Sequence, residues 1–256
     1  MLCLYAMDQI KFFETYVLGL KEEIIEETIA SSTIGNIVHD SLELIYKDYV
    51  GKRLKMGDFK KMKGKINTIV QSIIKNYVRE ENIYKGKNII IVETVKEYVK
   101  KVIELDQKTI EKGNRLKIIA VEREFENEIK DKEKKFKIRG KIDRIDELNG
   151  EVRVIDYKSG KKLRQRNITI KHSEELTKEK GIYNLQLLVY MLGIKEEFNE
   201  KTIKSGIINL KNISEGVLEG VFNGKTVLNN NEMENYKNKI ITIIANILDK
   251  DKLFKN

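Results

Sequence analysis

The stretch Gly140-Lys141-Ile142-Asp143-Arg144-Ile145-Asp146, followed after a short turn by Ile155-Asp156-Tyr157-Lys158, decides the fold that we predict for this chain. The turn is centred on Asn149-Gly150, and Asn-Gly between two alternating apolar runs is the strongest short-range signal for a two-residue β-hairpin. In that hairpin residues 148 and 151 face each other, which puts Asp143 directly opposite Asp156. Lys158 follows on the same face because side chains on a strand repeat with a period of two.

The two facing carboxylates repel each other and should destabilise the hairpin. A fold tolerates such a pair when a positive charge lies between them, and a divalent cation with oxygen ligands is the natural candidate. Charges on a strand are usually just solvated, but this face also carries Ile145, Val152 and Val154. We therefore expect it to pack against a core with the acids at its rim. On the opposite face, Asp146 and Arg153 form a structural cross-strand salt bridge.

The composition indicates a globular chain with a basic balance. It has 256 residues, 41% of them hydrophobic and 35% charged, and a formal net charge of +9. This length can bury one sizeable core, and the positive charge favours polyanionic partners. No apolar run approaches the ~20 residues that cross a bilayer. The apolar N-terminus lacks the basic lead-in of a signal peptide, so we expect a cytoplasmic protein without membrane contact.

Cysteine and histidine are too scarce for several kinds of site. Cys3 is the one cysteine, which excludes a disulfide within the chain and a four-cysteine zinc or iron–sulfur site. The two histidines, His39 and His172, are too few for a histidine-rich zinc site. Hard metals held by carboxylates remain as candidates.

Phosphodiester hydrolysis is the chemistry that the hairpin residues suit. It needs an activated water, a Lewis acid on the phosphoryl oxygen and stabilisation of the pentavalent state. Asp143 and Asp156 would bind the metal, and the backbone carbonyl of Tyr157 would supply another oxygen. Lys158 would orient or activate the water. Its alternative role is that of a surface lysine, but its place beside the acid pair favours catalysis.

Apolar periodicity divides the chain into a helical first part and a mixed second part. Predicted helices cover residues 7–24, 33–48, 66–79, 90–111, 180–194 and 231–249; predicted strands cover 115–129, the hairpin, 203–211 and 217–222. This order fits an α/β fold with a mixed central sheet flanked by helices. We expect a single domain over 1–256, with a mainly helical annex at 1–112 and a catalytic core at 113–256.

Four motifs in the right order resemble the PD-(D/E)xK nuclease superfamily, and most closely the RecB/AddB-type nuclease domain of bacterial recombination enzymes. Those domains carry a Gly-x-Ile-Asp strand, an Asp-Tyr-Lys strand ending in Ser/Thr-Gly, and a Gln-Leu-x-x-Tyr helix. The matching segments here are Gly140–Asp143, Asp156–Gly160 and Gln186–Tyr190. A histidine four residues after a glycine on an early helix is matched by Gly35 and His39.

The resemblance implies a restriction-endonuclease-like core and a role for each matched residue. His39 would be an additional metal ligand, whereas helix geometry alone makes it a half-buried histidine beside an apolar stripe. Gln186 and Tyr190 are four residues apart and share a helix face. They would contact the DNA backbone or brace the active site; the alternative is a polar edge on a core helix. Some relatives place an acidic ligand on the strand before the hairpin, and Glu122 is our choice over Glu124.

The activity implied by the resemblance is cleavage of DNA with Mg²⁺, or with Mn²⁺ as a substitute, in exonucleolytic end processing during recombination or repair. A helicase subunit on another chain is an implied partner. Three features depart from the family pattern. Ile142 stands where the superfamily's name has proline, Asp40 follows His39 where relatives often have glutamate, and the cysteines of the iron–sulfur relatives are missing.

Two other functions remain open. One is a non-catalytic nucleic-acid-binding module, against which the intact Asp143, Asp156 and Lys158 argue. The other is a structural subunit of a helicase–nuclease complex, which would need a large exposed apolar patch. A phosphohydrolase of the His-Asp type, suggested by His39-Asp40, lacks its other histidines.

Two basic stretches, 51–65 and 161–166, could track phosphates by counterion release. The first is equally compatible with a solvated surface. The second directly follows the active-site strand, so we favour DNA contact there. The segment 220–226 falls one residue short of a phosphate-binding loop, and we expect a strand and turn instead.

Overall fold

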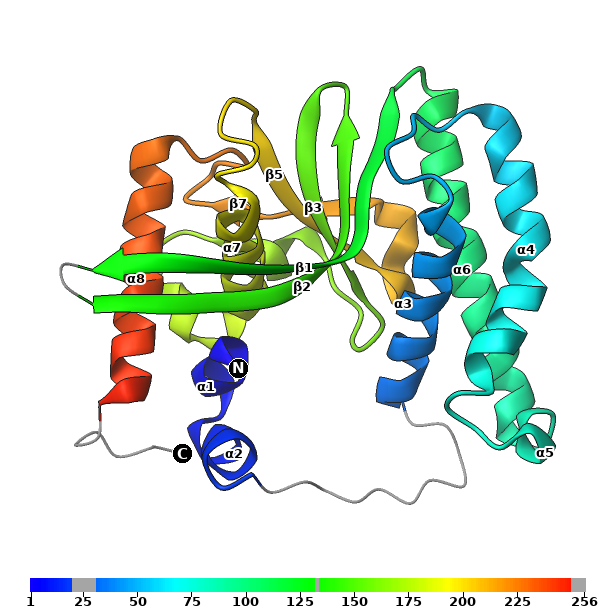
Figure 1. Cartoon of the computed structure of the whole chain (residues 1–256), viewed down its shortest axis with the longest axis horizontal. Coiled ribbons are helices and arrows are strands. Elements are labelled where there is room, and N and C mark those ends of the chain that lie inside the picture. The colour runs from blue at the N-terminus through cyan, green and yellow to red at the C-terminus, as the bar shows by residue number, and fades with distance from the viewer. Residues whose placement is uncertain (20–30, 132–133, 250–256) are drawn as a thin grey trace.

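A central sheet with helices on both sides makes up the described part of the computed structural model, which comprises residues 1–19, 31–131 and 134–249 (Figure 1). The α-helices are α1 (Leu2–Met7), α2 (Gln9–Phe12), α3 (Ser31–Lys47), α4 (Met56–Ile74), α5 (Glu80–Ile83), α6 (Lys87–Glu111), α7 (Ile182–Ile194) and α8 (Asn230–Leu248). Helices α3, α4 and α6 lie on one side of the sheet, and α1, α7 and α8 lie on the other.

The sheet has the strand order β1-β2-β3-β5-β6. Its members are β1 (Leu116–Asp131), β2 (Lys134–Leu148), β3 (Glu151–Lys158), β5 (Ile203–Asn209) and β6 (Val217–Glu219). Strands β3 and β5 run parallel and the other neighbours antiparallel, so the predicted mixed sheet flanked by helices is confirmed. A separate parallel pair, β4 (Thr169–Ile170) and β7 (Val221–Phe222), lies outside this sheet.

The β2–β3 hairpin has the predicted register. Leu148 pairs with Glu151 across the turn, and Asp146 pairs with Arg153. The two turn residues have positive φ, +54° at Asn149 and +98° at Gly150. A type I′ turn requires this conformation, which Asn and Gly adopt at little cost. The ladder ends at the pair of residues 144 and 155, and positions 143 and 156 come next.

Strands β1 and β2 continue past the sheet as a two-stranded ribbon across α7 and α8 (Figure 1). The ring of Phe125 fixes this crossing, because it fills the space beside two glycines. A Cβ at Gly193 on α7 would come within 2.5 Å of the ring, and one at Gly140 within 2.9 Å. The same ring meets Tyr190 edge-on, with 6.3 Å between the centroids.

Each face of the sheet has its own apolar core. On the α7 side, Ile145, Val152 and Val154 are fully buried, so the predicted packing of this hairpin face is confirmed. On the annex side, Ile155 and Tyr157 pack with the helices α3, α4 and α6. Both faces of β3 are therefore covered, and Asp156 near its end is buried.

The annex side of the sheet holds a buried network of charged residues. The Arg144 side chain is 1% exposed and forms ion pairs with Asp106 on α6 and Asp146, each at 2.7 Å. Asp106 also accepts a hydrogen bond from the Tyr46 hydroxyl on α3 at 2.5 Å, and the Arg144 guanidinium lies over the Tyr46 ring. Asp146 does pair with Arg153, as predicted, but the pair belongs to this larger buried network.

Helix α4 begins at Met56, inside the basic stretch 51–65. We had expected this stretch to lead into a helix that starts at residue 66. The buried residues of α4 follow helical spacing; they are Phe59, Met62, Ile66, Val70, Ile73 and Ile74. Lysines fill the solvent face between them and hid this pattern. The predicted helix start at 66 was therefore wrong, whereas the predicted helices at 33–48, 180–194 and 231–249 are confirmed within a few residues.

Two other expected elements are divided. The predicted helix at 7–24 is replaced by the short helix α2 and a π-helical turn, η1 (Phe13–Val17), after α1 has ended at Met7; residues 20–24 lie outside the described residues. Asp8 ends α1 and accepts the backbone N–H of Lys11 as the cap of α2. The predicted strand at 217–222 is split between β6 and β7, in different sheets. Among the described residues no helix is both long and apolar enough to cross a membrane.

Candidate metal and active site

Asp143, the first acid of the motif, lies on β2 just beyond the last paired residues of the hairpin. Asp143 is 8% exposed, and its Oδ2 accepts the backbone N–H of Tyr157 at 2.7 Å. This hydrogen bond ties β2 to β3 at the point where their regular ladder has ended. It occupies one carboxylate oxygen, and the second is available to another ligand.

Helix α3 supplies the imidazole. Nδ1 of His39 lies 3.5 Å from Asp143 Oδ2 and 3.6 Å from Glu122 Oε1, and Nε2 lies 3.1 Å from the carbonyl oxygen of Tyr157. One turn earlier, a Cβ at Gly35 would lie 2.8 Å from Ser159 Oγ. A glycine is therefore what allows α3 to come this close to the end of β3.

Glu122 enters the site through an unusual backbone conformation. It stands opposite Asp143, between two paired positions of β1 and β2, and its φ of +45° is rare for a residue with a side chain. Such strain persists only where the surroundings impose it. The side chain is 8% exposed and pairs with Lys141 Nζ at 2.7 Å as well as with His39.

His39, Glu122 and Asp143 form a cluster that could hold a metal ion, since one ligand atom from each lies within 4.8 Å of the others. Carboxylate oxygens and one imidazole suit a hard or borderline divalent cation. In the metal-free protein a proton on His39 supplies the positive charge beside the two carboxylates. Burial opposes the charged imidazolium, but hydrogen bonds with Asp143 and Glu122 outweigh it and raise the pKa of His39 to about 10.

A second group of polar side chains lies at the end of β3. Asp156 is buried, and its oxygens lie 2.8 and 3.0 Å from Lys158 Nζ. Its Oδ1 also accepts a hydrogen bond from Gln186 Nε2 at 2.9 Å, and Gln186 lies 2.7 Å from the Tyr190 hydroxyl. The two residues of α7 thus brace the acid from the side opposite α3.

Burial and the partner's charge together set the pKa values of Asp156 and Lys158. Burial, together with the Asp143 carboxylate, raises the pKa of Asp156 to about 6, against the effect of Lys158. Burial alone would lower the pKa of Lys158, but the Asp156 carboxylate outweighs it and raises that pKa. Near neutral pH the two therefore form a charged pair, with Lys158 held as an ammonium beside the carboxylate.

The structure thus brings every residue of the predicted site to one place, in two groups. Asp156 is outside the close three-residue cluster, because its carboxylate is directed to Lys158 and Gln186. Sequence reasoning missed Lys141, the partner of Glu122. Its position in the Gly-x-Ile-Asp motif gave no signal, since the pair depends on the strained backbone of β1.

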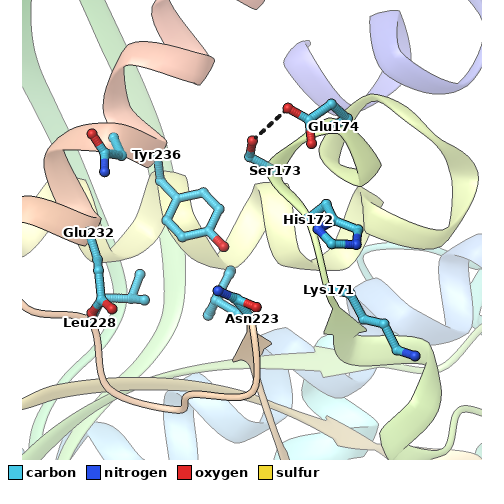
Figure 2. Close-up of a pocket in the computed structure, with 10 residues that line it drawn as sticks. Lys171, His172, Ser173, Glu174, Asn223, Leu228, Glu232 and Tyr236 are labelled. Atoms are coloured by element: carbon cyan, nitrogen blue, oxygen red, sulfur yellow. Dashed lines mark hydrogen bonds between the residues drawn. The ribbon is translucent and has the colours of Figure 1, made fainter.

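A separate pocket of about 290 Å³ lies between the 171–174 segment, the β7 turn and α8 (Figure 2). Its lining includes Lys171, His172 and Tyr236, and Tyr236 stands in its middle. None of the residues of the predicted site lines it. Among the described residues, the group of three close metal-ligating side chains is the His39 cluster, and His172 is not a member of it.

The family comparison agrees with this geometry. A model of the PD-(D/E)XK nuclease superfamily matches residues 4–255. The chain belongs to the PD-(D/E)XK nuclease superfamily. Membership indicates a nuclease, and hence a phosphodiesterase, and nucleases of this superfamily use divalent metals.

Other comparisons are weaker. No curated protein matches the chain. Among solved structures, the crystal structure of SSO0001 matches with 16% sequence identity and a TM-score of 0.30, covering 94% of this chain and 84% of that one. A similarity this low defines neither fold nor function.

Proposed function

We propose that this PD-(D/E)XK protein is a Mg²⁺-dependent deoxyribonuclease of the RecB/AddB type that degrades DNA from its ends in recombination or repair, with Mn²⁺ as a substitute metal. The observation that carries the proposal is the meeting of the His39, Glu122 and Asp143 cluster with the Lys158–Asp156 pair. A helicase subunit on another chain is the partner that this function would have.

The metal would be held by the close cluster, with Asp156 completing the ligand set. The carbonyl oxygen of Tyr157 would join it once the His39 ring turns away from that oxygen, which lies 3.1 Å from Nε2. His39 must lose its proton to bind, so metal uptake would release that proton. A bound cation would supply Lewis acidity to the phosphoryl oxygen and activate a water. Glu122 stays charged before the metal arrives: burial opposes its ionisation, but His39 and Lys141 outweigh burial and lower its pKa.

Lys158 would act on the reacting groups. Its ammonium is held by Asp156 at the end of β3, where it can orient the attacking water and offset the negative charge that develops on the phosphoryl group. Gln186 would hold the Asp156 carboxylate in place, and Tyr190 would hold Gln186. The half-buried site keeps these charges in a medium of low dielectric constant, where they interact more strongly than in water.

The proposal is tested by incubating the chain with end-labelled linear DNA and with covalently closed circular DNA, each in single- and double-stranded form. We expect linear DNA to be degraded in Mg²⁺ and in Mn²⁺, and to stay intact with a chelator, because the ligand set needs its cation. Circular DNA should resist.

The outcomes separate the parts of the proposal. Cleavage of circular DNA would retain the nuclease and overturn the exonucleolytic action. DNA binding without cleavage in any metal would indicate a non-catalytic binding module.

A further inference from the structure

A cleft lined by lysines lies between the end of α6 and the 3₁₀ segment η5 (Leu210–Glu215), on the annex side of the sheet. It has a volume of about 570 Å³. Five lysines line it from three separate segments of the chain, against two glutamates: Lys101, Lys108, Lys112, Lys162, Lys211, Glu104 and Glu215. The lining therefore carries a net positive charge.

Most of these lysines are not neutralised by the protein. Lys108, Lys112, Lys162 and Lys211 are exposed, and none of the four has an ion-pair partner among the residues that the structure describes. Two of them stand at the end of α6, where the helix dipole favours cations. That explanation does not extend to Lys162 or Lys211, which come from a loop and from η5. Like charges gathered on one cleft repel, and an anion bound there would remove the repulsion.

The cleft is joined to the active site by a short, tightly held loop. Lys162 comes four residues after Lys158, so their Cα atoms are at most about 14 Å apart. Asn209, at the end of β5, donates to the carbonyls of Lys158 and Lys161 and accepts the backbone N–H of Leu163.

Asn212 in η5 holds the far end of the same loop. Its side chain donates to the carbonyl of Leu163 at 2.9 Å and to Glu215 at 2.7 Å. Both asparagines are buried. The loop between the active-site lysine and the cleft is thus held in one conformation, and one of the two glutamates of the cleft is engaged in a hydrogen bond.

We propose that this cleft binds the phosphate backbone of the DNA strand that is cleaved at Lys158, a role that rests on the proposed nuclease function. The upper limit of about 14 Å between the Cα atoms of Lys158 and Lys162 corresponds to at most about four nucleotides at ~3.4 Å along the duplex axis. The lysines of α6 and η5 extend that contact beyond the loop. Lysine is a point-charge phosphate binder, so the cleft contributes affinity and register without reading sequence.

The test compares two variants that each remove three positive charges. The cleft variant carries Lys108→Gln, Lys112→Gln and Lys211→Gln. The control carries Lys47→Gln, Lys85→Gln and Lys87→Gln, three exposed lysines that lie outside the cleft and outside both basic stretches. Binding of a labelled DNA oligonucleotide is measured without metal, by fluorescence anisotropy over a range of salt concentrations. Cleavage in Mg²⁺ is measured in parallel on DNA and on bis(4-nitrophenyl) phosphate, which is too short to reach the cleft.

We expect the cleft variant to bind DNA about tenfold more weakly at 0.1 M salt, and the slope of log K against log salt to fall by up to about 2.7. Its KM for DNA should rise, whereas its kcat and its rate on bis(4-nitrophenyl) phosphate should not change. The DNA affinity of the control variant should stay within about twofold of wild type. Equal loss of DNA affinity in both variants, or wild-type affinity in the cleft variant, would contradict the proposed role of the cleft and leave the proposed nuclease function standing. A wild-type chain that neither binds nor cleaves DNA would overturn the cleft and the proposed function together.

Discussion

Replacing Lys158 by alanine is expected to lower the rate of DNA cleavage by about 10³-fold, close to 4 kcal/mol of transition-state stabilisation. The ammonium lies 2.8 Å from Asp156 and is the side-chain cation that we place on the reacting groups, beside the metal. Its loss removes charge stabilisation from the transition state more than from the bound DNA. The fall should therefore appear in kcat, measured under single-turnover conditions, with DNA affinity nearly unchanged.

The matched control is Lys204→Ala, which removes a lysine from β5 that pairs with Glu151 away from the site. It should cleave at the wild-type rate. Thermal unfolding of Lys158→Ala shows whether Asp156, left with Gln186 as its hydrogen-bond donor, still allows folding. A folded Lys158→Ala variant that cleaves within about threefold of wild type would remove Lys158 from the mechanism.

The largest effect on stability is expected from Arg144→Met, at about 3–5 kcal/mol in the free energy of unfolding. The Arg144 side chain is 1% exposed and neutralises Asp106 and Asp146, which are themselves buried. Methionine fills similar space but leaves these carboxylates short of positive charge in the core. Urea unfolding followed by circular dichroism measures the loss.

Two companion variants distinguish the buried network from simple packing. Arg153→Met removes the other partner of Asp146, which keeps Arg144, and should cost much less. Adding Asp106→Asn to Arg144→Met removes one of the stranded charges, so the double variant should be more stable than the sum of the single effects predicts. A cost below about 1 kcal/mol for Arg144→Met, or strict additivity, would contradict the network.

The hairpin is the part of the fold that local sequence could predict. Asn149-Gly150 sets the turn, and alternation on both sides then leaves one register in which apolar residues face a core. The helices with a clear apolar stripe were predictable for the same reason. Helix α4 was placed too late because its lysines, on the solvent face, concealed a regular buried stripe.

The candidate site could be predicted only in part. Asp143, Asp156 and Lys158 follow from the hairpin register, whereas His39, Gln186 and Tyr190 came from the family resemblance. No local pattern shows that a helix about a hundred residues earlier meets the hairpin. The close approach at Gly35 and the strained φ of Glu122 that bring these ligands together are properties of the folded chain.

Apart from the Asp146–Arg153 pair, the buried network lay beyond sequence reasoning. Asp106 looks like an ordinary charge on a long helix, and Arg144, between Asp143 and Ile145, looks like an ordinary polar strand residue. Their pairing depends on how α3 and α6 dock on the sheet, which brings Tyr46 and Asp106 to the same guanidinium. Such long-range pairs leave no spacing in the sequence to recognise.

Cleavage of end-labelled linear DNA by Asp143→Asn, beside wild type and across a range of Mg²⁺ concentrations, is the most direct test of a metal-dependent nuclease at this site. Asparagine keeps an acceptor for the backbone N–H of Tyr157 and removes the charge that the cation needs. We predict that wild type cleaves in Mg²⁺ and that Asp143→Asn, although folded, is at least about 10²-fold slower at every concentration. Equal cleavage by both proteins, with the same dependence on Mg²⁺, would contradict the account.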